Sequence, residues 1–233
     1  MSIEPQILYQ DEHLIALNKP TGLATLVEGW HPERLTAMRW AEMRCGKVYL
    51  VHRLDKVTSG ILLFARTPEA HRHLSLQFET HQVRKRYWAI LNGEPTWDEI
   101  RADYPLRSNV GHHHRTVVSS QGKAAETVFR VLARAKGYAW VEAQPRTGRT
   151  HQIRAHAAAL GYPLLGDVLY AAPATSLIQR PALHAWSLTF IHPHFQEEQT
   201  LQAPLVDDFL RTLEILGMVS HDSQSSHAAH LTP

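Results

Sequence analysis

The chain has 233 residues, of which 44% are hydrophobic and 20% are charged, a length that suits one large domain with a substantial buried core. No window approaches the roughly 20 apolar residues that a transmembrane helix needs, and the first residues lack the basic and apolar regions of a secretion signal. We therefore expect a soluble cytoplasmic protein. The single cysteine, Cys45, excludes an intramolecular disulfide and a cysteine-rich zinc site, and we interpret it as an ordinary, partly buried thiol.

The formal net charge is only +2, which is too small by itself to indicate nucleic-acid binding. The distribution is more informative, because basic residues gather at 52–56, 84–86 and 146–156, whereas acidic residues gather in the last fifth of the chain. Each cluster alone is typical of a solvated surface. Three such clusters beside apolar strands instead favour a single basic groove.

The first half of the chain alternates strand-like and helical patterns. Residues 14–23 predict a strand that runs into a Pro-Thr-Gly turn, and residues 60–65 predict a short buried strand. Helical periodicity covers 35–44. A second helix is expected over 67–79, where a Thr-Pro pair supplies the N-cap and the first helical position.

The second half is richer in strands. The alternation in 86–93 places Tyr87 on one side of a strand, together with Ala89 and Leu91. The remaining expected elements are a hairpin centred on 135–137, a helix over 151–161 that ends at a glycine, and a strand over 183–193.

Hairpins mixed with a few helices, without regular strand-helix-strand alternation, predict an α+β fold on a mixed, largely antiparallel sheet with flanking helices. The basic clusters predict a central basic cleft. We find no internal repeat or linker, so residues 1–219 are expected to form one catalytic domain. Residues 220–233 are polar and nearly free of large apolar residues, and we expect them to be a disordered tail.

Seventeen histidines raise the question of a metal site, and the run His-His-His-Arg at 112–115 is the obvious candidate. It has no cysteine beside it and no helical histidine pair of the metalloprotease type, so we interpret it as a flexible polar loop. His151 and His156 are five residues apart and do not share a helical face. The histidine pattern therefore does not indicate a metal site.

Asp55 stands between Arg53 and Lys56 in the segment 51–60. Neighbouring positive charges favour an ionised carboxylate, which is a poor proton donor. Three roles remain open at this stage: a nucleophile, an electrostatic stabiliser, or one half of a structural ion pair.

The helix that starts near Thr150 carries Arg149, His151 and Arg154 in its first turn and approach. Positive charge is disfavoured at a helix N-terminus, so we expect a compensating anion, either a phosphate or a carboxylate such as Asp55. His151 and Arg154 face the same way because they are three residues apart. The alternative is an arginine that is simply exposed.

Four segments together resemble the RluA family of pseudouridine synthases in order and approximate spacing. They are NKPTGL at 18–23, HRLDKVTSG at 52–60, RKRYWAILNG at 84–93 and RTGRTHQIRAHAAALGYPLLGDVLY at 146–170. The resemblance runs from about Ile7 to Pro204 and implies a single catalytic domain of the pseudouridine-synthase type. That family isomerises uridine in RNA to pseudouridine without a metal or organic cofactor.

By this resemblance, Asp55 is the catalytic aspartate that acts at C1′ of the flipped nucleotide. Tyr87 is the aromatic residue that lies against the target base, and Arg154 is the partner that holds Asp55. Arg53 is similar to the residue that takes the place of the extruded nucleotide. Further RNA contacts are expected from Lys85, Arg149 and His151.

The resemblance also implies a structured RNA partner, a ribosomal or transfer RNA stem-loop, and we expect a monomer. Only six residues precede the first strand-like segment, so we expect no N-terminal S4 RNA-binding domain. Relatives of the RluA type and of the TruC type both remain possible on this ground.

Two other classes of protein compete with this interpretation. A glycosidase also places a carboxylate at an anomeric carbon, but it normally needs a second carboxyl group. In the three longer motifs we identify no second acid in addition to Asp55. An RNA-binding module without catalysis would need basic and aromatic residues but not Asp55. The combined set of Asp55, Tyr87 and Arg154 favours the enzyme.

Overall fold

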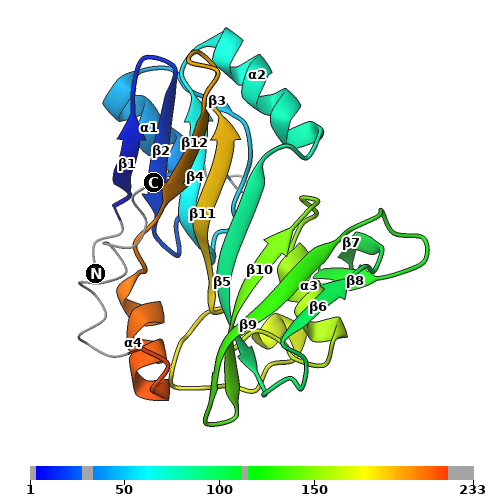
Figure 1. The fold of residues 1–233 in the computed structure, drawn as a ribbon. Helices are drawn as coiled ribbons and strands as arrows, with labels where there is room; N and C mark the ends of the chain where they lie inside the picture. The colour runs from blue at the N-terminus through cyan, green and yellow to red at the C-terminus, as the bar shows by residue number, and fades with distance from the viewer. Residues whose placement is uncertain (1–3, 28–33, 112–114, 220–233) are drawn as a thin grey trace.

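In the computed structural model, residues 4–27, 34–111 and 115–219 are described, and they form a ten-stranded mixed sheet, a separate two-stranded sheet and four α-helices (Figure 1). The helices are α1 (Ala37–Cys45), α2 (Pro68–Glu79), α3 (Gln152–Ala159) and α4 (Asp207–Leu216), with a short 3₁₀ turn η1 (Val168–Tyr170). The strands are β1 (Gln6–Gln10), β2 (Leu14–Lys19), β3 (Tyr49–Leu50), β4 (Ser59–Ala65), β5 (Arg84–Asn92), β6 (Glu99–Ala102), β7 (Leu106–Val110), β8 (Arg115–Val118), β9 (Thr127–Ala135), β10 (Tyr138–Pro145), β11 (Leu183–Ile191) and β12 (Glu198–Gln202).

The main sheet runs in the order β1-β2-β4-β11-β5-β10-β9-β6, and β3 and β12 pair with β4 and β11 beside this path. Among the described strand pairs, the pair β4–β11 is parallel, with His184 opposite Ser59 and Ala185 opposite Gly60, and the other pairs are antiparallel. The predicted α+β fold with a largely antiparallel mixed sheet is therefore confirmed.

The centre of this sheet is where β4 comes closest to β11. Gly60 of β4 has a φ of +107°, and a Cβ atom at this position would collide with the backbone of Ala185. Only glycine fits such a close approach at a positive φ. The segment that carries Asp55 leads directly into β4. Asp55 therefore lies near the middle of the sheet.

Helices α1 and α3 cover the part of the sheet on which Tyr87 lies. The apolar side of α1 packs on β2 and β4 through Trp40, and that of α3 packs on β5, β9 and β10 through Ile153. Tyr87 contacts both of these cores, and with Ala89 and Leu91 it follows the predicted strand alternation. Its side chain therefore lies between the two helices.

The residue types at the helix ends explain why the helices begin where they do. Thr67 caps α2 by accepting a hydrogen bond from the Ala70 amide at 3.1 Å, and Pro68 takes the first position, as predicted. Helix α1 is capped in the same way by Thr36. The predicted helix over 151–161 is shorter, 152–159, with Gly161 just beyond its end.

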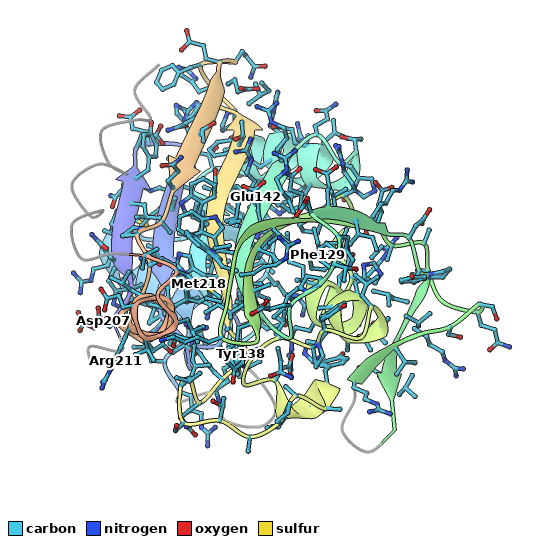
Figure 2. The ribbon with its side chains drawn as sticks, turned by 60° about the horizontal axis from the view of Figure 1, so that its bottom comes forward. Phe129, Tyr138, Glu142, Asp207, Arg211 and Met218 are labelled. Carbon is cyan, nitrogen blue, oxygen red and sulfur yellow. The ribbon has the colours of Figure 1, made fainter. Side chains whose placement is uncertain are left out.

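The elements that were not anticipated from the sequence include β6, β12, the ribbon of β7 and β8, and helix α4. Helix α4 packs Phe209 and Leu213 against the far side of β5 and β10. In Figure 2, Asp207 and Arg211 lie on the outer surface of α4, while Met218 lies toward Tyr138. Helix α4 therefore covers this part of the second face, and α2 covers the part over β2, β4 and β11.

Other expectations from the sequence have mixed outcomes. Cys45 is partly buried and free, as expected. Residues 220–233, for which we predict a disordered tail, and 112–114 of the histidine run lie outside the described residues, so both expectations stay predictions. No helix within the described ranges is long and apolar enough to cross a membrane.

Candidate active site

The segment that carries Asp55 has its backbone fixed on both sides of the carboxylate. Before it, Thr25 Oγ1 donates to the Leu54 carbonyl at 2.8 Å and accepts from the Leu54 amide at 3.2 Å. After it, the carbonyl of Lys56 accepts from the Gly22 amide at 2.8 Å and from the buried Lys19 ammonium at 3.3 Å. The segment 19–25 therefore holds Asp55 rigidly, as a catalytic group requires.

A second support reaches the same loop from α4. Arg180 forms a two-pronged ion pair with Asp208 at 2.7 and 2.8 Å, and its Nη1 donates to the Val57 carbonyl at 3.4 Å. The Arg180 side chain is only 6% exposed. An otherwise unanticipated C-terminal helix is thereby tied to the backbone two residues beyond Asp55.

Asp55 lines a cleft of about 1290 Å³ that also includes Tyr87 and the start of α3. Its cationic lining residues are Arg53, Lys56, Lys85, Arg149, Arg154 and Arg180, and its acidic ones are Asp55, Glu79 and Asp167. The predicted basic cleft is present, and it is large enough for a nucleotide taken out of its stack.

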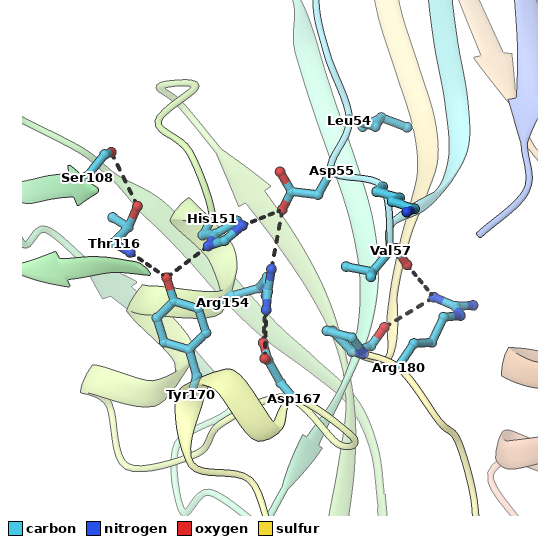
Figure 3. A network of polar contacts seen from close by, with 12 residues as sticks. Leu54, Asp55, Val57, Ser108, Thr116, His151, Arg154, Asp167, Tyr170 and Arg180 are labelled. Carbon is cyan, nitrogen blue, oxygen red and sulfur yellow. Dashed lines mark hydrogen bonds and ion pairs between the residues drawn. The ribbon is translucent and has the colours of Figure 1, made fainter. Parts of the chain in front are cut away.

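The carboxylate of Asp55 lies at the entrance to α3, opposite His151 and Arg154 (Figure 3). Its Oδ2 atom is 3.7 Å from His151 Nε2 and 3.7 Å from Arg154 Nη1. The expected proximity of Asp55 and Arg154 is confirmed, although 3.7 Å is an ion-pair distance and too long for a hydrogen bond.

The principal partner of Arg154 is a residue that we did not single out, Asp167. Arg154 donates to both carboxylate oxygens of Asp167, at 2.7 and 2.8 Å, and the two side chains are 5% and 1% exposed. Burial acts to lower the pKa of Arg154, but the hydrogen bonds and charge of Asp167, together with Asp55, outweigh burial and raise the pKa. The compensating anion expected at this helix is therefore a carboxylate, but it is in the first place Asp167 and only in the second place Asp55.

The same finding corrects the search for a second acid. Asp167 lies inside the motif at 146–170, so the prediction that these motifs hold no acid other than Asp55 is wrong. A buried carboxylate that already accepts two hydrogen bonds from Arg154 is not free to act as a glycosidase general acid or base. The argument against a glycosidase therefore rests on the engagement of Asp167 and not on its absence.

The two cations that flank Asp55 in the sequence line the cleft and are not its ion-pair partners in the described structure. Arg53 and Lys56 are exposed, and within the described residues neither forms an ion pair with Asp55. Both line the cleft instead. Two exposed cations at the rim are available to an RNA phosphate or, for Arg53, to the space that an extruded nucleotide leaves.

Tyr87 presents its ring to the cleft from the middle of β5. Burial, and then the negative charge of Asp55, raise the pKa of Tyr87, so its hydroxyl is protonated at neutral pH. Within the described part of the chain, this hydroxyl forms no hydrogen bond. Tyr87 thus offers a flat face and a neutral polar group beside the carboxylate.

Two of the predicted RNA contacts are tied to backbone carbonyls. Lys85 donates to the Thr147 carbonyl at 2.8 Å, and burial lowers the pKa of Lys85 to about 8. Arg149 donates through Nε to the Ala124 carbonyl at 3.1 Å. Because neither is paired with a carboxylate within the described residues, both keep a positive charge directed at the cleft.

His151, the third predicted RNA contact, lies within the Asp55 cluster. Its side chain is 18% exposed, and its Nδ1 is 3.2 Å from the hydroxyl of Tyr170. Burial lowers the pKa of His151, and Arg154 adds to this effect, whereas the charges of Asp55 and Asp167 oppose it. A neutral imidazole facing Asp55 is better placed to orient the carboxylate than to bind phosphate.

Sequence reasoning missed Asp167, Tyr170 and Arg180. The first two had a signal, because the matched motif ends in Gly-Asp-Val-Leu-Tyr, and an Asp and a Tyr three residues apart share one side of a helical turn. Arg180 had none, because its partner Asp208 is 28 residues away. In the described ranges, no three histidine, cysteine or acidic side chains gather as metal ligands.

Comparison with known proteins agrees with this geometry. A family model described as RNA pseudouridylate synthase matches residues 13–159. The ribosomal large subunit pseudouridine synthase D of Nitrosomonas europaea is 35% identical over 96% of this chain and 69% of its own length. The dual-specificity RNA pseudouridine synthase RluA of Escherichia coli is 37% identical over 85% of this chain and 92% of its own length.

Solved structures agree as well. The human RNA pseudouridylate synthase domain containing 4 superposes with a TM-score of 0.75 at 28% identity, covering 91% of this chain and 92% of that one. For the human domain containing 1, the TM-score is also 0.75, with 99% and 96% of the two chains covered. The chain therefore belongs to the RNA pseudouridylate synthase family and is an RNA pseudouridine synthase, an isomerase.

Proposed function

We propose that this enzyme isomerises a specific uridine in ribosomal or transfer RNA, with Asp55 acting at C1′ of the flipped nucleotide. The observation that carries the proposal is the placement of Asp55. It is held by a fixed backbone in a basic cleft, with Oδ2 facing His151 and Arg154. Within the described residues, Oδ1 forms no hydrogen bond or ion pair, which leaves this oxygen for the substrate.

The chemistry requires one bond to break and another to form. The bond between N1 and C1′ breaks, the base turns, C5 bonds to C1′, and the proton on C5 is finally replaced by one on N1, so that the product has the mass of the substrate. C1′ becomes electron-poor when the base departs. An ionised carboxylate can stabilise this carbon or bond to it, and Asp55 has the exposure to reach it.

Tyr87 and Arg53 are assigned complementary roles around that step. The ring of Tyr87 supports the base from the floor of the cleft, and its hydroxyl assists removal of the C5 proton. Arg53 at the rim occupies the space that the nucleotide vacates, which offsets part of the cost of unstacking, a few kcal/mol. Lys85 and Arg149 hold the phosphates.

The cleft and its candidate residues are supplied by one chain, which supports action as a monomer. Ribosomal and transfer RNA substrates support a cytoplasmic location. A molar mass near 26.5 kDa in light scattering, unchanged upon dilution, is the expected result for a monomer, and twice that mass would overturn this part of the proposal.

The proposed function can be tested with unmodified ribosomal and transfer RNA transcripts that carry tritium at uridine C5. We expect tritium release into water, a stop in carbodiimide-based mapping at a defined uridine, and unchanged RNA mass. The reaction should persist in EDTA. Loss of a base from the RNA, or activity that chelation abolishes and zinc restores, would contradict the proposal. Mapping in cells with and without the protein then identifies the physiological site.

A further inference from the structure

A chain of polar contacts runs from the β7–β8 ribbon to Asp55 (Figure 3). It begins at Thr116 of β8, which is fully buried and whose hydroxyl donates to Ser108 Oγ of β7 at 3.2 Å. The Thr116 amide donates to the Tyr170 hydroxyl at 2.9 Å. The Tyr170 hydroxyl in turn lies 3.2 Å from His151 Nδ1, and His151 Nε2 lies 3.7 Å from Asp55 Oδ2.

The direction of these hydrogen bonds follows from the donors at each step. A backbone amide can only donate, so the Tyr170 oxygen accepts from Thr116. The Tyr170 proton can then be donated to His151 Nδ1 at 3.2 Å, and the Thr116 side chain is a second neighbour of the same hydroxyl. A neutral imidazole that accepts at Nδ1 carries its proton on Nε2, and that nitrogen is the one that faces Asp55.

The position of His151 is fixed by the backbone as well. It is the residue immediately before α3, with a φ of 52° in the left-handed region, an unusual conformation for a non-glycine residue that tends to occur at functional sites. Its carbonyl accepts the Ala155 amide at 2.9 Å. The backbone of His151 therefore cannot be moved without displacing the start of the helix.

Tyr170 also contacts Arg154, the cation at the carboxylate. The Arg154 guanidinium lies 5.1 Å from the centre of the Tyr170 ring, and the His151 ring meets the same ring edge-on at 5.9 Å. His151 and Arg154 both face the Oδ2 atom of Asp55. An arginine and an imidazole N–H that both lie 3.7 Å from Oδ2 favour this rotation of the carboxylate by electrostatic attraction and leave Oδ1 for the substrate.

We propose that His151, held by Tyr170 with its proton on Nε2, is a positioning residue that orients the Asp55 carboxylate toward the substrate. This inference rests on the proposed role of Asp55 and adds that Tyr170 acts through His151. It replaces the predicted role of His151 as an RNA contact. The residues Ser108 and Thr116 of the β7–β8 ribbon then hold Tyr170 in place.

The test is a double-mutant cycle measured by single-turnover kinetics and RNA binding. Tyr170→Phe keeps the ring but removes the donor to Nδ1, so we expect the rate to fall about tenfold, the equivalent of one hydrogen bond, with RNA affinity unchanged. His151→Ala should lose at least as much. His151→Gln retains an amide donor and should recover most of that loss.

The cycle separates positioning from simple packing. In the His151→Gln background, Tyr170→Phe should have no further effect on the rate, because an amide donor does not depend on a tautomer. Additive losses, a fully active Tyr170→Phe, or a weaker RNA affinity that accounts for the loss would overturn the inference. An inactive Asp55→Asn together with fully active His151 variants would remove this inference and leave the proposed function standing.

A matched control tests whether the helix alone is responsible. His156 is a buried histidine on the same helix that contacts Thr127 and Tyr104 instead of the Asp55 cluster. His156→Gln should lower thermal stability without lowering the rate at a temperature where it is folded. Equal loss of rate in His156→Gln and His151→Ala at equal stability would overturn the inference.

A spectroscopic readout does not depend on activity. In the full chain with nitrogen-15-labelled histidines, the signals that disappear in His151→Gln belong to His151. We expect these signals to show a protonated Nε2 and an unprotonated Nδ1, and to show a mixture of the two tautomers in Tyr170→Phe. A wild-type spectrum with the proton on Nδ1 would overturn the inference.

Discussion

Arg154 of α3 donates two hydrogen bonds to Asp167, at 2.7 and 2.8 Å, and both side chains are almost completely buried. This pair leaves one edge of the guanidinium, Nη1, for Asp55. The positive charge at the site is therefore fixed by Asp167, independently of whether Asp55 is occupied with substrate.

The first prediction follows from that pair. Asp167→Asn leaves the Arg154 charge buried without its partner, a change that typically costs about 3 to 5 kcal/mol of stability. We expect urea unfolding to show a loss of that size and activity to fall even where the variant is folded. Asp98→Asn, which breaks the exposed pair with Arg134, is the control and should cost less than about 1 kcal/mol. Equal stability of the two variants would contradict the argument.

A second prediction concerns the hydroxyl of Tyr87. Tyr87→Phe keeps the ring on the floor of the cleft but removes the polar group beside Asp55. We expect RNA affinity to stay within about twofold and the single-turnover rate to fall by at least tenfold, the scale of a general acid-base contribution. Full activity in Tyr87→Phe would reduce the residue to a stacking platform.

Lys85 gives the cleft a pH dependence. Since burial lowers the pKa of Lys85 to about 8, the charge that is present at pH 7 disappears as the pH rises through 8. Bound phosphate favours the charged form, so we expect RNA affinity to weaken between pH 7 and 9, on the order of tenfold for one charge-assisted contact. The stability of the folded protein should instead increase above pH 8, because the cost of burying the ammonium is present below pH 8 and fades above it.

The control for this titration is Lys85→Arg, whose side chain stays charged throughout that range. When both proteins are measured with the same RNA at each pH, the RNA affinity of Lys85→Arg should stay constant from pH 7 to 9. If the RNA affinities of the wild type and of Lys85→Arg weaken in parallel as the pH rises, the titrating group is not Lys85.

Salt provides an independent measure of the phosphate contacts. Four lining cations, Arg53, Lys56, Lys85 and Arg149, have no carboxylate partner within the described residues. If all four release counterions, raising salt from about 50 to 200 mM should weaken binding roughly 50- to 150-fold. Arg53→Gln should reduce the slope of the logarithmic plot by nearly one. An affinity that does not change with salt would exclude a phosphate-binding cleft.

The strands and helices with strong local signals were predictable from the sequence. Thr67 and Pro68 determined the start of α2, and the alternation around Tyr87 predicted which side of β5 faces the cleft. Helix α4 had a usable pattern too, since Asp207 and Asp208 precede Phe209 and Leu213, but we considered only the charges of that segment. Strand β12 had little signal, because most of its side chains are exposed.

The identity of the site residues was predictable from the motifs that carry them. The contacts between residues on distant segments were less predictable. Asp55 and Arg154 lie on separate motifs, and their proximity follows from the resemblance. The pairing of Arg154 with Asp167 depends on the turn after α3, which brings a residue 13 positions away into bidentate contact. No local propensity specifies such a contact, because it is made by packing.

The central claim is that the Asp55 carboxylate acts directly on the substrate, and Asp55→Asn tests it most directly. The substitution is nearly isosteric and removes only the negative charge, so we expect the thermal unfolding temperature and the RNA affinity to remain close to those of the wild type. Tritium release from uridine C5 in the target RNA should be abolished. Substantial release by a folded Asp55→Asn protein that binds this RNA would contradict the claim.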